Sequence, residues 1–149
     1  MIRVTDIVDG TTQFDPRLIT VVGNKMFFEA EKTPYGRELW VYDDNGIHMV
    51  RDINPDGHGN LSGGFFTGFK NKLVFSARVT STGVELWVSD GTESGTKIIK
   101  DIWPGIMGSG VVSPVIIGDT LYFSANDGTD GEIWRLLSPD GQPEKFTNV

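Results

Sequence analysis

Three glutamates recur at equal spacing along the chain: Glu38, Glu85 and Glu132 lie 47 residues apart. Carboxylates serve as general acids, general bases and cation ligands, so the set raises the question of acid–base chemistry. A catalytic pair needs two carboxylates in one cleft, in surroundings that push their pKa values apart. Repeated positions have equivalent surroundings. The spacing therefore favours a structural role, in which each carboxylate accepts backbone N–H bonds or pairs with a cation and fixes its strand. A ring of carboxylates around a central channel is the alternative.

A tryptophan stands two residues after each glutamate, at Trp40, Trp87 and Trp134. Large aromatic side chains in the middle of a strand typically pack in a core, so these three are predicted to be buried between repeat units. Stacking on a sugar would require exposure. Trp103 differs because it lies in a connection between two units, and it is the candidate ligand-binding aromatic.

Oxygen donors crowd the segment 126–132, Asn-Asp-Gly-Thr-Asp-Gly-Glu, in the manner of a calcium loop. Its spacing is wrong, because Gly128 stands where a ligand is needed, and a polar turn is predicted instead. The chain has no cysteine, and His48 and His58 occupy unrelated repeat positions. This composition argues against zinc and excludes thiolate chemistry, so no metal and no cofactor are expected.

The 47-residue spacing belongs to a repeat of the whole chain. Each copy consists of four short apolar segments joined by turns; in the middle copy they cover 65–69, 73–75, 84–88 and 97–100. The turn Lys70-Asn71 suits a two-residue hairpin, and its counterparts are Gly23-Asn24 and Gly118-Asp119. The strands are apolar on both faces, which is typical of sheets that pack face to face.

These patterns predict an all-β protein, a β-propeller made of four-stranded antiparallel blades, with three blades per chain and completion by oligomerisation. A β-sandwich is the rival. The predicted organisation is one repeat domain over 1–149, in which 1–7 form an orphan fourth strand. The three blades cover 8–53, 54–102 and 103–149.

The segment Glu85-Leu86-Trp87-Val88-Ser89-Asp90-Gly91-Thr92 resembles the ELWxxDGT repeat of bacterial, mostly secreted or surface-attached proteins. Leu121–Gly128 and Lys100-Asp101-Ile102 agree with the same family. The motif, including Asp90, is complete only in the middle unit, since the other two units differ after their tryptophans. The resemblance implies an extracellular or cell-surface repeat module without catalytic activity, and it implies no established ligand.

The overall charge restricts the partners of the protein. The net charge of -7 argues against nucleic acid, since proteins that bind phosphate backbones display basic patches. No apolar run reaches the roughly 18 residues of a membrane helix, so membrane insertion is not expected. The first residues lack the apolar segment of a signal peptide.

The leading hypothesis is a binding or scaffolding propeller module with itself as a partner, most simply a homodimer that closes a six-bladed ring. A glycan or a protein is a possible ligand. The alternative is a propeller hydrolase or lyase with a site at the channel mouth, because fold does not decide function. Its candidate residues are Arg37, Arg78, Asp130 and Arg135, near the ends of the third strands. A purely structural fragment is a third possibility.

Overall fold

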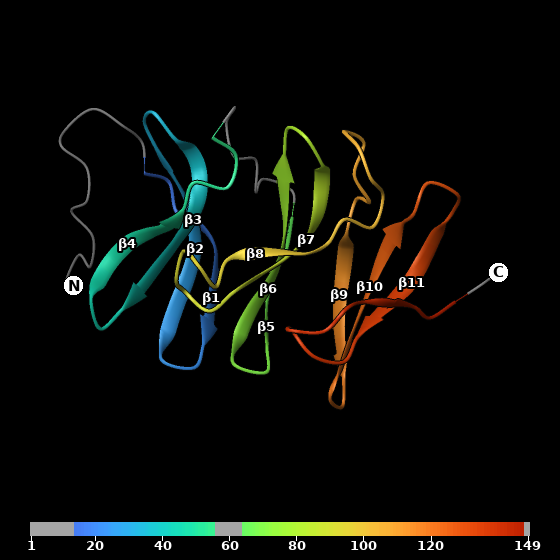
Figure 1. Ribbon diagram of the computed structural model, residues 1–149. Helices are drawn as coiled ribbons and strands as arrows, with labels where there is room; N and C mark the ends of the chain where they lie inside the picture. Colours follow the sequence, from blue (N-terminus) through green and yellow to red (C-terminus); the bar gives the residue numbers. More distant parts are fainter. Residues whose placement is uncertain (1–13, 56–63, 148–149) are drawn as a thin grey trace.

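The computed structural model describes residues 14–55 and 64–147, and in these ranges the chain forms twelve β-strands and no helix. The strands make three four-stranded antiparallel sheets (Figure 1). The prediction of an all-β protein built from three four-stranded units is confirmed. The predicted orphan strand over 1–7 lies outside the described residues. The described ranges also hold no helix that could span a membrane.

Each sheet is a meander, in which sequence order and spatial order coincide. The first sheet contains β1 (Arg17–Val22), β2 (Lys25–Lys32), β3 (Gly36–Asp43) and β4 (Gly46–Arg51). The second contains β5 (Phe66–Phe69), β6 (Lys72–Val79), β7 (Gly83–Ser89) and β8 (Lys97–Lys100). The third contains β9 (Val112–Ile117), β10 (Thr120–Asn126), β11 (Gly131–Leu136) and β12 (Glu144–Lys145).

The first hairpin of every sheet closes through two residues, as predicted. Gly23 has a φ of 61° and Gly118 a φ of 57°, while Lys70 and Asn71 have φ values of 46° and 64°. Positive φ at these positions gives the turn the twist of the flanking strands. The short turns keep consecutive strands adjacent and thereby set the meander.

Successive side chains alternate between the two faces of each sheet. The face of each sheet that carries the tryptophan is called here the tryptophan face. Its apolar residues are Met26, Phe28, Ala30 and Trp40 in the first sheet, Leu73, Phe75, Ala77 and Trp87 in the second, and Leu121, Phe123, Ala125 and Trp134 in the third. The opposite face is called the leucine face, and it contains Val22, Phe27, Leu39, Val41 and Val50 in the first sheet and Phe69, Val74, Leu86, Val88 and Ile99 in the second.

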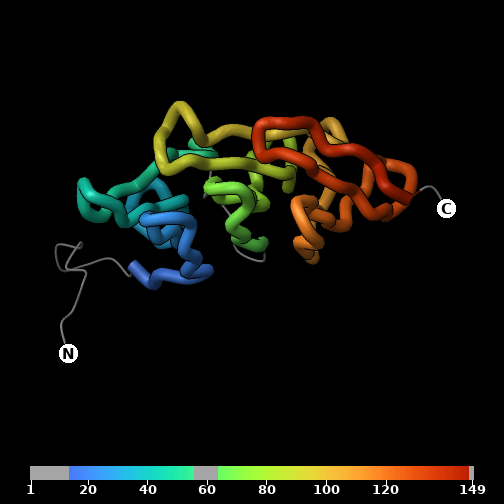
Figure 2. Tube along the Cα trace, turned by 90° about the horizontal axis from the view of Figure 1, so that it is seen from below, coloured from blue at the N-terminus to red at the C-terminus, as the bar shows by residue number. Residues whose placement is uncertain are grey.

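The core is made where these two kinds of face meet. The leucine face of the first sheet packs against the tryptophan face of the second, and the leucine face of the second packs against the tryptophan face of the third. The same interface is therefore formed twice. In Figure 2 the three sheets lie side by side, with β1, β5 and β9 along one edge of the molecule and β8 and β12 along the other.

The last strand is shorter than predicted. The sequence predicts a fourth strand from Lys145 to Asn148, but β12 ends at Lys145. The Thr147 hydroxyl accepts the backbone N–H of Ile133 at 3.0 Å, and both Phe146 and Thr147 donate their N–H groups to the Ile133 carbonyl. A side-chain oxygen thus replaces the backbone carbonyl in the ladder, and regular pairing stops there.

Candidate functional site

Glu85 is a fully buried carboxylate on β7 that binds the connection between the second and third sheets. It accepts hydrogen bonds from the backbone N–H of Ile102 at 3.0 Å and of Ser109 at 2.7 Å. The Ser109 hydroxyl donates a further bond at 2.7 Å, and the Trp103 N–H lies at 3.4 Å. Burial raises the pKa of Glu85, while these donors act in the opposite sense. One side chain therefore holds both ends of an irregular segment.

The other two glutamates also accept hydrogen bonds from the segment that follows the fourth strand of their own sheet. Glu38, buried on β3, accepts the N–H of Ile53 at 2.9 Å, and Ile53 precedes the second sheet as Ile102 precedes the third. Glu132 on β11 accepts a bond from the hydroxyl of Thr147. Each carboxylate holds its own neighbouring segment, and in the described ranges no hydrogen bond joins any two of the three. The arrangement is one of repeated clamps rather than of an acid–base pair in one cleft.

Glu38 provides a test through pH. Burial raises its pKa to about 7 from an ordinary value of 4.5, so the folded state favours the protonated form. The contribution of protonated Glu38 to the free energy of unfolding is present in full below pH 4.5 and is lost as the pH rises through about 7. Between pH 4.5 and 7.5, wild type should lose up to about 3 kcal/mol more of its free energy of unfolding than Glu38→Gln, which cannot ionise.

Urea denaturation at a series of pH values measures this difference. Glu93→Gln is the matched control, because Glu93 is exposed on the surface, and its pH dependence should follow wild type. Equal slopes for wild type and Glu38→Gln would show that Glu38 keeps an ordinary pKa in the fold.

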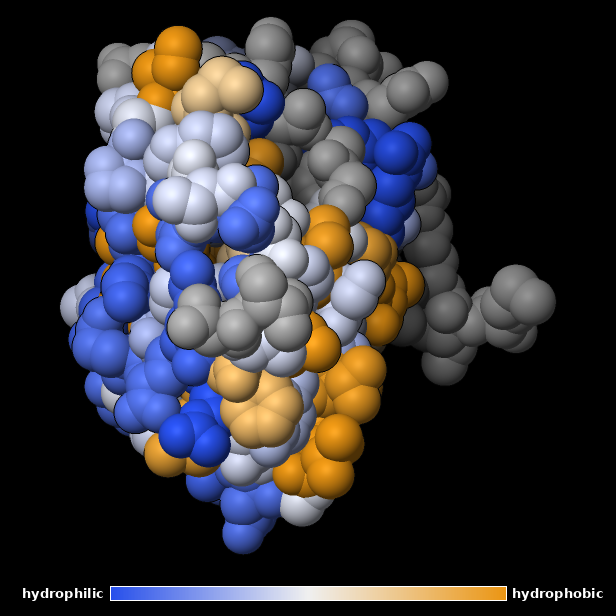
Figure 3. Space-filling model, turned by 90° about the vertical axis from the view of Figure 1, so that its right-hand side faces the viewer, coloured by the Kyte–Doolittle hydropathy of each residue, from blue (hydrophilic) through white to orange (hydrophobic). Residues whose placement is uncertain are grey.

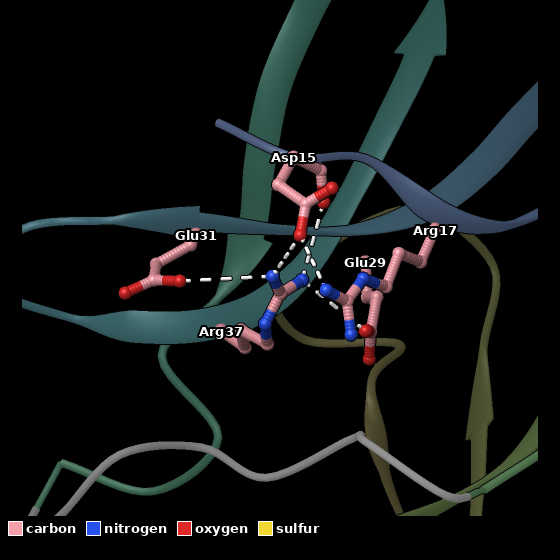
Figure 4. A network of polar contacts seen from close by, with 5 residues as sticks. All are labelled: Asp15, Arg17, Glu29, Glu31 and Arg37. Carbon is pink, nitrogen blue, oxygen red and sulfur yellow. Dashed lines mark hydrogen bonds and ion pairs between the residues drawn. The ribbon is translucent and has the colours of Figure 1, made fainter. Parts of the chain in front are cut away.

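Arg37 lies at the centre of a charge network in the first sheet (Figure 4). Its guanidinium is 2.5 Å from Asp15, 3.3 Å from the buried Glu29 and 3.7 Å from Glu31, and Arg17 is 2.6 Å from Asp15. The hydrogen bond from Arg37 holds the pKa of Asp15 below its ordinary value, whereas burial raises that of Glu29. The network ties the segment before β1 to β2 and β3.

The four residues considered for catalysis are spread over all three sheets, with Asp130 and Arg135 both in the third. Arg37 is on β3 in the network above, Arg78 is exposed on β6, and Asp130 is exposed before β11. Arg135 on β11 pairs with Glu144 at 2.9 Å. Within 14–55 and 64–147, no hydrogen bond or ion pair links any one of the four to another. The structure therefore does not bring them together.

The polar segment 126–132 is a turn held by its own side chains. Asn126 accepts the N–H of Gly128 at 2.7 Å, and Asp127 accepts the N–H and the hydroxyl of Thr129. The Lys145 ammonium lies 2.5 Å from Asp127 and holds the pKa of that carboxyl well below its usual range. The cation that pairs with the Asp127 carboxylate in this turn is thus the ammonium group of Lys145. Among the described residues no group of three or more His, Cys, Asp or Glu is arranged to hold a metal.

Calcium is accordingly expected to leave stability unchanged. Asp127 already has a cationic partner, and a ligand stabilises only a state that binds it. Thermal melts with chelator and with millimolar calcium should agree within about 1 °C. Magnesium at the same concentration controls for ionic strength. A rise of several degrees with calcium alone would mean that the 126–132 turn is a calcium loop after all.

Trp103, the candidate ligand-binding aromatic, is half-buried and packs on the same turn. Its Nε1 lies 3.0 Å from where a Cβ on Gly128 would stand, and Gly128 has a φ of 95°. A larger residue at Gly128 would collide with the indole. The sequence draws attention to Trp103 and to Gly128 separately, but it does not predict the contact between them, because the two residues are distant along the chain.

Asp90 organises the turn of the complete motif. Its carboxylate accepts the N–H of Thr92 at 2.9 Å and the Thr92 hydroxyl at 2.7 Å. The Asp90 carbonyl accepts the Lys25 ammonium from the first sheet at 2.6 Å. Lys72, at the same place in the second sheet, reaches Asp140 in the third at 2.6 Å. A lysine on the leucine face of the first sheet, and another on that of the second, thus binds the turn after the third strand of the next sheet.

The leucine face of the third sheet forms an open apolar hollow of about 430 Å³. Ile117, Ile133 and Phe146 on it are 65%, 44% and 52% exposed. Figure 3 looks onto this side of the molecule and shows apolar side chains gathered along one margin. The repeat pattern predicts an uncovered blade face, but it does not say which side chains shape the hollow.

Comparisons with protein-family profiles, with curated proteins and with solved structures found no match for this chain. The functional interpretation therefore depends on the geometry described above.

Proposed function

We propose that the chain is a non-catalytic β-propeller repeat module, a binding or scaffolding domain that assembles with itself into a closed ring. One observation carries the proposal. The leucine face is a buried core surface in the first and second sheets, whereas Ile117, Ile133 and Phe146, at the corresponding positions of the third sheet, are exposed to solvent. A surface built as core and left open is unfavourable in water, and it marks an interaction site.

Ring closure is the arrangement that covers every such face. Propellers usually contain about four to eight blades, so three sheets are too few for a ring. Two chains would supply six sheets. In a propeller the first strands of the blades lie close together around the axis. The first strands β1 and β5 fit this geometry, because a Cβ on Gly68 of β5 would lie 3.2 Å from the side chain of Val22 on β1. We therefore identify the three sheets with propeller blades for two reasons: each sheet is a meander that packs face to face on the next, and the first strands of all three lie along the same edge of the molecule (Figure 2).

The resemblance to ELWxxDGT repeats adds the expectation of a bacterial extracellular or cell-surface protein. A glycan or protein ligand would then bind at loops on the rim of the ring, where irregular segments of a propeller are accessible.

Light scattering coupled to gel filtration tests the assembly. The expected mass is twice the chain mass of 16.4 kDa, independent of loading concentration over the micromolar range. A monodisperse single-chain mass would contradict the proposal. A heterogeneous, growing mass would indicate open stacking instead of closure and would contradict the ring.

A further inference from the structure

We infer that a proton on Glu38 latches the connection between the first and second sheets, and that its loss releases this connection while the one between the second and third sheets stays in place. The described part of the first connection is 52–55, and the second connection covers 101–111. The inference concerns the joints inside one chain and does not depend on the proposed self-assembly.

The first connection is held from both sides. Glu38 on β3 accepts the N–H of Ile53 at 2.9 Å. Asn54 reaches the second sheet, where its side-chain oxygen accepts the N–H and the hydroxyl of Thr80, each at 3.0 Å. Ile53 is buried in the core between the first two sheets. The connection therefore joins β3 of one sheet to the β6–β7 turn of the next, and loosening the connection would loosen the joint between the two sheets.

Two carboxylates with few donors lie at this joint. Glu38 is fully buried, and among the described residues neither Glu38 Oε1 nor the buried Oδ1 of Asp52 has a hydrogen-bond partner. Burial and the negative charge of Asp52 raise the pKa of Glu38 to about 7, while the N–H groups of Ile53 and Asn54 act in the opposite sense. A proton on Glu38 removes the repulsion between the two carboxylates and adds an O–H donor beside oxygens that can only accept.

No other charged group of the described residues acts on Glu38. Arg37, its neighbour on β3, is engaged in the network of Figure 4. Arg51, at the end of β4, donates to the Thr96 carbonyl at 2.6 Å. The second sheet contacts the connection through the uncharged Thr80. Because the pKa of Glu38 is raised, the latch holds below a pH of about 7 and opens above it.

The second connection is held by more donors. Glu85 accepts the N–H groups of Ile102 and Ser109 and the Ser109 hydroxyl. Donors of this kind stabilise the charged form of a carboxylate, so Glu85 can lose its proton and still bind the connection. Asp101 stands at the place of Asp52, and its Oδ1 is likewise buried without a partner among the described residues. Asp101 therefore provides the matched control.

Hydrogen exchange of single amides tests the latch. The Ile53 N–H is bonded to Glu38, so its protection factor reports whether the connection is closed. Between about pH 5.5 and pH 8 this factor should fall by about tenfold or more in wild type, because Glu38 loses its proton in this range. The protection of the Ile102 amide, which is bonded to Glu85, should fall much less.

Three variants connect the effect to the carboxylates. Glu38→Gln cannot ionise, so the fall at Ile53 should disappear. Asp52→Asn removes the charge that raises the pKa of Glu38 and should reduce the fall. Asp101→Asn should leave the fall at Ile53 as it is in wild type. Circular dichroism verifies that each variant is folded. If Glu38→Gln does not fold, the comparison of Asp52→Asn with Asp101→Asn decides.

The outcomes that contradict the latch are specific. An equal fall at Ile53 and Ile102 in wild type would show that proton loss weakens the whole fold, and it would overturn the inference. A fall that persists unchanged in Glu38→Gln, or that is the same in Asp52→Asn as in Asp101→Asn, would assign the pH dependence to other groups and overturn it as well.

Discussion

Trp87→Ala is expected to lower the free energy of unfolding by about 3–5 kcal/mol, which is a large part of the stability of a domain of this size. The indole is 6% exposed and fills the interface between the first and second sheets. It packs on Phe75 with ring centroids 6.4 Å apart. Alanine would leave a cavity between two sheets that cannot collapse, because the backbones on both sides are fixed by their ladders. Urea denaturation followed by circular dichroism measures the loss.

Trp103→Ala is the matched control for this change. It removes the same side chain from a half-buried position in a loop, so the loss should be clearly smaller than for Trp87→Ala. If Trp87→Ala melts within a few degrees of wild type, the tryptophan face is not the packed surface described here.

Glu85→Ala is expected to cost more than about 3 kcal/mol. The change leaves the N–H groups of Ile102 and Ser109 without their buried acceptor, while the Ser109 hydroxyl keeps the Val84 carbonyl at 3.3 Å. Each unsatisfied buried donor costs about 1–3 kcal/mol. The connection between the second and third sheets should also open locally. Hydrogen exchange of the Ile102 and Ser109 amides should accelerate beyond the effect on amides in β6.

Glu93→Ala controls for the removal of a carboxylate from the same unit. Glu93 is exposed, and a surface substitution of this kind usually changes stability by less than about 0.5 kcal/mol. Unchanged protection of Ile102 and Ser109 in Glu85→Ala would mean that the segment is held by other contacts and that the carboxylate is not a clamp.

Local patterns explain why much of the fold is readable from the sequence. Strands and hairpins depend on neighbouring residues, so the alternation around Glu85–Val88 and the turn Lys70-Asn71 are sufficient to predict them. Equal spacing predicts equal surroundings for the three glutamates, and in the structure each accepts a hydrogen bond from the segment after the fourth strand of its own sheet. β12 was the exception, since its end is set by the Thr147 hydroxyl and the N–H of Ile133, a contact between two strands.

The sequence by itself determined the all-β class, the three four-stranded units and the positions of their turns, because these follow from residue types within a few positions of one another. Only the tertiary structure decided which donors Glu85 binds, that Lys25 reaches Asp90, that Lys145 pairs with Asp127 and that Arg37 gathers three carboxylates. It also distinguished the covered leucine faces from the open one. These features join residues that are distant along the chain, and their geometry exists only once the sheets are packed together.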